Sequence, residues 1–254
     1  MKGKRLAGRC AVITGGALGI GRATALSFGE EGAHVVIADL DREHAEETAA
    51  EVSAKEVKAR AFVTDVTARL DVEKMFSEAS EFMGGVDILV TCAGGYTKYG
   101  KFEDIAEDEW DRMIELNLKS VYLCCKAVLP FMKERGWGRI INLGSRAGRS
   151  AIGGTSPAHY GSAKGAVAIL TQYIAKEVGP YGITANTVAP GTALTERVEK
   201  LLTPEKREMF IKDCPLGYLA QPEEISGVIT FLASDESRYI TGATIDVNGG
   251  RLML

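Results

Sequence analysis

The fold of this chain is decided by one stretch near its start, Cys10-Ala11-Val12-Ile13-Thr14-Gly15-Gly16-Ala17-Leu18-Gly19-Ile20-Gly21. The first five residues form a short apolar run, which is typical of a strand buried on both faces of a parallel sheet. The glycines that follow predict a tight turn, and from Gly19 to about Glu30 the apolar residues recur at helical spacing. A strand, a glycine-rich turn and a helix in this order predict the first unit of an α/β domain.

The same alternation continues to the end of the chain. Further strands are predicted at residues 34–38, 61–64, 88–91, 139–143, 184–188 and 244–247, and helices at 41–52, 68–82, 108–133, 158–178 and 222–233. Strands that alternate with helices of this length imply right-handed crossovers. We therefore predict a single doubly wound Rossmann-type α/β domain over residues 1–254, with a seven-stranded parallel sheet flanked by helices. The segment 192–219 is predicted to add short helices and loops as a candidate substrate lid.

The composition narrows the possible partners. The chain has 254 residues, of which 46% are apolar and 25% charged, as is ordinary for a soluble globular protein. Its net charge of -4 gives no electrostatic reason to expect a nucleic acid or an anionic membrane. The five cysteines, without a Cys-x-x-Cys motif, favour a reducing compartment, and the three histidines lack the spacing of metal ligands. No apolar run approaches the roughly 20 residues that span a bilayer. We therefore expect a cytoplasmic protein that binds no metal, nucleic acid or membrane.

The glycine turn from Thr14 to Gly21 is a candidate phosphate site. Backbone N–H groups and the positive end of a helix dipole bind phosphate, and glycine lets the ligand approach closely. A tight turn between strand and helix also needs glycine for structural reasons alone, so the pattern leaves both interpretations open. Asp39 favours a cofactor, because it follows Gly21 by 18 residues at the end of the next strand, where a carboxylate accepts both hydroxyls of an adenosine ribose. The alternative is that Asp39 caps the next helix.

Asp39 also bears on the choice of cofactor. Its carboxylate would repel a 2′-phosphate, and the nearest cations, Arg22 and Arg42, are not obviously aimed at the site. NAD is therefore favoured over NADP.

Tyr160 and Lys164 form a candidate catalytic pair on the predicted helix 158–178. A spacing of four places both side chains on one face, one turn apart. A nearby cation favours the phenolate and lowers the pKa of a tyrosine toward the range useful for proton transfer, and Lys164 is placed to supply that charge. The alternative is an ordinary surface tyrosine and a solvated lysine.

Together these motifs resemble the short-chain dehydrogenase/reductase family, and the resemblance covers nearly the whole chain. The Thr-Gly-x-x-x-Gly-x-Gly turn of the short form of this family is matched by Thr14 to Gly21. Its catalytic tetrad falls, by order and local context, on Asn117, Ser145, Tyr160 and Lys164. The resemblance implies a cofactor site formed by Gly15, Ala17, Leu18, Gly19, Ile20, Gly21, Asp39, Leu40, Asp65, Val66, Cys92, Ala93, Gly94, Tyr160, Lys164, Pro190, Gly191, Ala193 and Thr195.

The resemblance also implies a role for each member of the tetrad. Tyr160 is expected to act as general acid/base, Ser145 to donate a hydrogen bond to the substrate oxygen, and Lys164 also to hold the nicotinamide ribose. Asn117 is expected where its helix bends locally, with its backbone carbonyl binding a water in a proton path. Substrate contacts are expected from residues next to the active-site strand ends: Tyr96, Ser145, Arg146, Thr155 and Tyr160.

Three features depart from the family pattern. Thr91-Cys92 replaces the usual Asn-Asn after the fourth strand, so two side-chain hydrogen bonds that brace the sheet must be replaced. The loop between Ser145 and Tyr160 is longer than usual, and Ala193 replaces a common isoleucine beside the nicotinamide. Within that loop region, His159 is expected to have a loop or pocket-wall role rather than a catalytic one. Transfer of a relative's substrate to this chain is therefore unsafe.

The predicted function is NAD-dependent interconversion of a secondary alcohol and a ketone by hydride transfer. The alternative enzyme is a 3-oxoacyl-thioester reductase acting on an acyl-carrier-protein or CoA substrate. The alternative of another class is a non-catalytic NAD-binding sensor or scaffold. The resemblance further implies a homotetramer, a dimer of dimers in which helices 108–133 and 158–178 form one interface.

Overall fold

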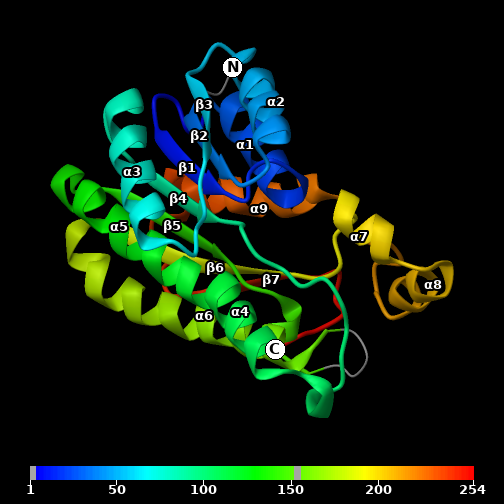
Figure 1. Ribbon diagram of the computed structural model, residues 1–254. Helices are drawn as coiled ribbons and strands as arrows, with labels where there is room; N and C mark the ends of the chain where they lie inside the picture. Colours follow the sequence, from blue (N-terminus) through cyan, green and yellow to red (C-terminus); the bar gives the residue numbers. More distant parts are fainter. Residues whose placement is uncertain (1–3, 152–155) are drawn as a thin grey trace.

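The computed structural model describes residues 4–151 and 156–254, in which strands and helices alternate as predicted (Figure 1). The strands are β1 (Cys10–Thr14), β2 (His34–Asp39), β3 (Ala59–Val63), β4 (Ile88–Thr91), β5 (Gly138–Leu143), β6 (Ile183–Pro190) and β7 (Thr244–Val247). The α-helices are α1 (Gly19–Glu30), α2 (Arg42–Ser53), α3 (Arg69–Met83), α4 (Glu107–Ile114), α5 (Ser120–Arg135), α6 (Ala158–Val178), α7 (Glu196–Leu201), α8 (Pro204–Lys212) and α9 (Pro222–Ala233).

The sheet of the described residues is parallel, with the strand order β3-β2-β1-β4-β5-β6-β7. β2 and β4 flank β1, so the chain winds outward from β1 in both directions. The crevice above the carboxyl ends of β1 and β4 is the switch point at which open α/β sheets bind ligands. The predicted seven-stranded, doubly wound sheet is confirmed.

Helices cover both faces of this sheet. Successive residues of a strand point to opposite faces, and β1 shows the consequence. Val12 packs in the core that contains Phe76 of α3 and Val167 of α6, whereas Ile13 packs in the core that contains Phe28 of α1 and Ile225 of α9. Because both faces are buried at the centre of the sheet, β1 and β4 are almost continuous apolar runs.

The structure differs from the sequence prediction in two places that matter for the site. The helix predicted at 108–133 is interrupted, because α4 ends at Ile114 and a π-helical turn, Glu115–Lys119, connects it to α5. β6 continues to Pro190 rather than ending at residue 188, and it carries the chain to the edge of the crevice. The segment 192–219 holds α7 and α8, which lie together at one side of the molecule (Figure 1). No helix of the described chain is both long enough and apolar enough to cross a membrane.

Candidate active site

A pocket of about 810 Å³ runs along the carboxyl edge of the sheet, with walls from the segments that follow β1, β2, β3, β4, β5 and β6. Of the expected substrate contacts, Tyr96, Ser145, Arg146 and Tyr160 line the pocket, and Thr155 lies outside the described residues. All the residues expected to form the cofactor site line the same pocket: Gly15, Ala17, Leu18, Gly19, Ile20, Gly21, Asp39, Leu40, Asp65, Val66, Cys92, Ala93, Gly94, Tyr160, Lys164, Pro190, Gly191, Ala193 and Thr195.

Two glycines of the turn after β1 are required by packing alone. Gly15 has a φ of +65°, and a Cβ there would lie 2.5 Å from the backbone nitrogen of Ala93, in the segment after β4. A Cβ on Gly21 would collide with the carbonyl oxygen of Gly15. The structural interpretation of these glycines is therefore sufficient by itself. A phosphate site is indicated instead by α1, whose N-terminal residues Gly19 and Ile20 line the pocket.

The carboxylate of Asp39 faces the glycine turn from the end of β2. One of its oxygens accepts a hydrogen bond from the Ala17 N–H at 3.1 Å, and the other accepts one from the Asp41 N–H at 3.1 Å. The N-cap of α2 is Asp41, whose side chain accepts a hydrogen bond from the His44 N–H. The alternative that Asp39 caps this helix is therefore wrong, and its carboxylate is held at the rim of the pocket.

Two arginines that lie near Asp39 in the sequence are paired elsewhere. Arg22 lies 2.8 Å from Glu51, and Arg42 lies 3.4 Å from Glu46. We call the lining residues 39–41 and 64–66 the acidic end of the pocket, because they include Asp39, Asp41 and Asp65 and no basic residue.

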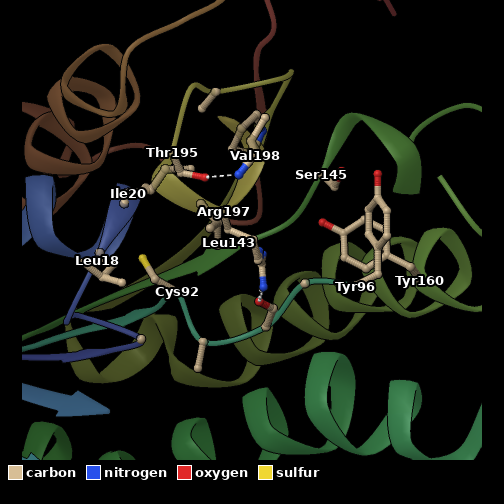
Figure 2. A pocket seen from close by; sticks show the side chains of 18 of the residues that line it. Leu18, Ile20, Cys92, Tyr96, Leu143, Ser145, Tyr160, Thr195, Arg197 and Val198 are labelled. Carbon is tan, nitrogen blue, oxygen red and sulfur yellow. Dashed lines mark hydrogen bonds between the residues drawn. The ribbon is translucent and has the colours of Figure 1, made fainter. Parts of the chain in front are cut away.

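Tyr160 lies in the first turn of α6, and its ring centroid is 4.9 Å from that of Tyr96. Ser145 stands just beyond the end of β5, and Figure 2 shows it gathered with both tyrosines on one side of the pocket. Burial raises the pKa of the Tyr160 phenol, and a side-chain hydrogen bond with Ser145 opposes that rise. The serine, rather than a cation, is thus the partner that most favours the phenolate here.

Lys164 lies one turn farther along α6 and is 3% exposed. Its ammonium donates a hydrogen bond to the Leu143 carbonyl at 2.7 Å and lies 6.0 Å from the centroid of the Tyr160 ring. Burial lowers the pKa of Lys164 to about 8. The interpretation of Lys164 as a solvated surface residue is therefore wrong. The expectation that Lys164 brings the pKa of Tyr160 below its ordinary value is also wrong for this arrangement, because burial of the phenol outweighs the groups that lower its pKa.

Asn117 sits in the π-helical turn between α4 and α5, so the expected local bend is present. Its side-chain carbonyl accepts a hydrogen bond from the Gly95 N–H at 2.7 Å, and its amide nitrogen donates to the Gly95 carbonyl at 3.1 Å. The residue does not line the pocket. In this structure Asn117 holds the segment that follows β4 in place.

Thr91-Cys92 stands where the family usually has Asn-Asn. A short series of side-chain hydrogen bonds across the sheet takes the place of the bonds that the two asparagines would make. The Thr91 hydroxyl donates to the Asn142 carbonyl oxygen at 2.9 Å, and the Asn142 amide donates to the Thr171 hydroxyl at 2.9 Å. This chain braces β4 against β5 and α6. Cys92 is left to line the pocket, where burial raises the pKa of its thiol to about 12.

His159 does not belong to the pocket wall. It is 1% exposed, and its ring stacks on Trp110 of α4 with 6.5 Å between centroids. It lies in the first turn of α6 but does not line the pocket. The expectation of a loop or pocket-wall role is therefore wrong, since the helix turn directs this side chain into the contact with α4.

Sequence reasoning missed two charged residues at the start of α7. The Glu196 carboxylate accepts a hydrogen bond from the Gly19 N–H at 3.1 Å, at the N-terminus of α1. The Arg197 guanidinium donates two hydrogen bonds to the Gly94 carbonyl, at 3.2 and 3.3 Å, and Figure 2 shows it inside the pocket. These partners are more than a hundred residues apart in sequence, and no local pattern signals the contacts.

The described residues fit a nicotinamide dinucleotide. The pocket has the volume of a cofactor site. The N-terminus of α1 suits a diphosphate, Asp39 suits a ribose diol, and Lys164 and Tyr160 line the same pocket. In the described part of the chain, no group of three or more His, Cys, Asp or Glu residues is arranged to hold a metal ion.

Several known proteins are similar to this chain over almost its whole length. A family model described as enoyl-(acyl carrier protein) reductase matches residues 15–251. The chain is 40% identical over 244 residues to the (2S)-[(R)-hydroxy(phenyl)methyl]succinyl-CoA dehydrogenase subunit BbsD of Thauera aromatica, with 96% of each chain covered. It is 38% identical to the 3-oxoacyl-[acyl-carrier-protein] reductase FabG of Thermotoga maritima, with 97% of this chain and 98% of the relative covered. The crystal structure of gox2181 superposes with a TM-score of 0.94 at 35% identity, covering 97% of this chain and 96% of that chain.

Proposed function

The chain belongs to the short-chain dehydrogenase/reductase family of nicotinamide-dependent oxidoreductases, and from this premise we propose that it uses NAD to interconvert a secondary alcohol and a ketone. The observation that carries the proposal is that Ser145, Tyr160 and Lys164 line the same pocket as the glycine turn and Asp39. A proton donor and a site for a dinucleotide thus share one cavity.

We propose a role for each of these residues, and their common pocket supports it. In the oxidation direction the Tyr160 phenolate accepts the hydroxyl proton of the alcohol, and in reduction the phenol returns a proton to the carbonyl oxygen. Ser145 donates a hydrogen bond to the same oxygen and stabilises the charge that develops on it. The cofactor, when bound, accepts or supplies the hydride on carbon. Lys164 holds the nicotinamide ribose, and Asn117 acts indirectly by positioning the segment at Gly95.

The preference for NAD rests on the acidic end. A 2′-phosphate beside Asp39 would meet like charge, and Arg22 and Arg42 are engaged with Glu51 and Glu46. We expect NAD to be used more efficiently than NADP, as measured by the ratio of kcat/KM for the two cofactors with one alcohol.

A second candidate is a 3-oxoacyl-thioester reductase. Lys98, which lies 3.5 Å from Glu109, and Lys206 are exposed side chains that line the pocket, where they would meet the phosphates of CoA or an acyl carrier. The two relatives above are named as a (2S)-[(R)-hydroxy(phenyl)methyl]succinyl-CoA dehydrogenase subunit and a 3-oxoacyl-[acyl-carrier-protein] reductase. Faster reduction of acetoacetyl-CoA with NADPH than oxidation of any free alcohol with NAD would favour this candidate. Tight NADH binding without turnover in either assay would favour the sensor or scaffold.

We also propose a cytoplasmic homotetramer with the segment 192–219 as a lid. All five cysteines are free thiols, which suits a reducing compartment. Large apolar side chains, Tyr122 of α5 and Ile169 and Tyr173 of α6, are exposed on the helices expected to form the dimer interface. Light scattering of the purified protein at several concentrations tests the assembly. A monomer throughout would contradict it.

The decisive experiment is a panel of secondary alcohols with NAD, followed by the absorbance of the reduced nicotinamide. The proposal expects NADH formation with at least one alcohol and its loss in Tyr160→Phe. Full activity in that variant would reject the assigned role.

A further inference from the structure

The start of α7 lies between two segments that are expected to hold the dinucleotide. Glu196 and Arg197 are the first two residues of this helix, and both line the pocket. Successive residues of a helix point about 100° apart, so the two side chains reach in different directions. The Glu196 carboxylate accepts a hydrogen bond from the Gly19 N–H, and the Arg197 guanidinium donates two to the Gly94 carbonyl. One short helix therefore contacts the segments after β1 and after β4 at the same time.

The Glu196 carboxylate takes a position that suits a phosphate. Gly19 is the first residue of α1, and the free N–H groups and positive dipole at the start of a helix favour an anion. Here the anion is a carboxylate of the chain itself, 3.1 Å from the Gly19 nitrogen. A diphosphate at the same helix end would lose this donor and would be repelled by the carboxylate. Glu196 and a dinucleotide therefore compete for the start of α1.

The Arg197 guanidinium covers the backbone that follows β4. Its hydrogen bonds to the Gly94 carbonyl measure 3.2 and 3.3 Å, and a Cβ on Gly95 would collide with the guanidinium. The charge of Arg197 also acts on Lys164, which is proposed to hold the nicotinamide ribose. Burial lowers the pKa of Lys164 most, and Arg197 adds to that lowering. Arg197 therefore lies in the nicotinamide half of the pocket, where Figure 2 shows its side chain.

The way in which α7 is held allows it to move. A helix of six residues has little stability of its own in water, so tertiary contacts hold it in place. Its N-cap, Thr195, accepts a hydrogen bond from the Val198 N–H at 3.3 Å and packs against Gly19. Glu196 and Arg197 are exposed residues. Because exposed groups exchange their hydrogen bonds with water at a small net cost, little free energy is needed to break these contacts.

We propose that Glu196 and Arg197 make an autoinhibitory contact, in which the start of α7 occupies the diphosphate and nicotinamide positions of the pocket and is displaced as a unit when a dinucleotide binds. This inference rests on the proposed function, since it concerns the same cofactor site. It differs in sign from a lid, because a lid that closes over a ligand strengthens binding, whereas this contact weakens it. When only a fraction of the protein is open, the apparent affinity is reduced by that fraction. Removal of either contact should therefore tighten binding.

The test uses NADH together with ADP, which lacks the nicotinamide half of the dinucleotide. Arg197→Met should lower the Kd of both ligands by about two- to tenfold, the usual worth of a hydrogen bond, because it releases the helix that also carries Glu196. Loss of a cation would by itself weaken the binding of both anions. Fluorescence titration measures NADH, and calorimetric titration measures ADP. The matched control is Lys200→Met, which removes an exposed cation of the same helix outside the pocket wall and should leave both Kd values unchanged.

Two results would overturn the inference and leave the proposed function intact. One is an unchanged or higher Kd of both ligands in Arg197→Met. The other is an equal decrease of Kd in Lys200→Met, which would assign the effect to the general charge of α7. Failure of the proposed function has a different signature. If neither ligand binds to the wild type or to the double variant Glu196→Gln/Arg197→Met, the cofactor site is rejected, and the autoinhibitory contact with it.

Discussion

The acidic end and the part of the pocket that Lys98, Arg197, Lys206 and Phe210 line, which we call the basic end, are built in different ways. At the acidic end the backbone decides the geometry, because the turn after β1 and the ends of β2 and β3 are placed by the parallel pairing of the strands. At the basic end side chains decide it, and several of them come from α7, α8 and the segment after β4. The sheet therefore dictates the geometry of the acidic end, whereas the basic end is shaped by segments that the sheet does not constrain.

The largest effect on activity is expected from a substitution of Tyr160, the proposed proton donor. Tyr160→Phe removes the proton that both directions of the reaction need, and kcat should fall by at least about 100-fold, the usual worth of a general acid/base. NADH affinity should change little, because the substitution keeps the ring and removes only the hydroxyl group. Steady-state rates and fluorescence titration of NADH measure the two quantities separately. Tyr99→Phe, an exposed tyrosine that lines the same pocket, is the control and should keep its rate within about twofold.

The next effect is on the pH dependence of stability and comes from Lys164, the buried cation of the site. The pKa of Lys164 is about 8 in the folded protein against 10.5 ordinarily. Below pH 8 the amine is protonated in both states, so the cost of burying its charge is present in full. Between pH 8 and 10.5 the unfolded chain binds the proton that the folded protein has released, so stability rises with pH. Lys164→Met lacks this rise.

Urea unfolding of the wild type and of Lys164→Met at several pH values tests whether stability rises or falls with pH. The free energy of unfolding of the wild type, minus that of Lys164→Met, should increase across this window by up to about 3 kcal/mol. The cysteines with raised pKa values, such as Cys124 and Cys125, oppose the rise in each protein alone, and the subtraction removes their effect. A difference that stays flat or falls with pH would show that Lys164 is not held as a buried amine.

The sequence predicts the backbone-built end well. β1, β4, α1 and α6 lie at their predicted bounds, because each apolar run or period is closed by a glycine, a proline or a polar residue. The candidate cofactor residues stand at strand ends, and the carboxyl ends of parallel strands share one edge. For that reason all of them line one pocket.

Side-chain directions and degrees of burial could not be predicted in the same way. The four-residue spacing places Lys164 near Tyr160, but it does not show that the ammonium bonds to Leu143 or that burial raises the pKa of the phenol. The contact of Glu196 with Gly19 joins residues 177 positions apart. Such a contact depends on how α7 packs, and no local periodicity encodes it.

A smaller effect tests the acidic end alone. Asp39→Asn keeps an oxygen that can accept from the Ala17 N–H and removes the charge that would repel a 2′-phosphate. The ratio of kcat/KM for NAD to that for NADP should fall about tenfold, which corresponds to one charge interaction of about 1.4 kcal/mol near a protein surface. Steady-state kinetics with both cofactors give the ratio. The control is Glu43→Gln, an exposed acid in the first turn of α2, and an equal change there would assign the effect to general charge.

The smallest effect is expected on NADH affinity, from a substitution of Glu196, the residue of α7 that contacts the start of α1. The carboxylate of Glu196 accepts from the Gly19 N–H, which a diphosphate at the N-terminus of α1 would also use. Because a dinucleotide must compete with that carboxylate, Glu196→Gln should tighten NADH binding by about two- to fivefold, the worth of one charge at a helix end. Fluorescence titration measures the Kd, and Glu199→Gln, an exposed acid on the same short helix, should leave it unchanged. Weaker NADH binding in Glu196→Gln would mean that α7 closes over the cofactor and helps to hold it, so that the two ends cooperate through this helix rather than compete.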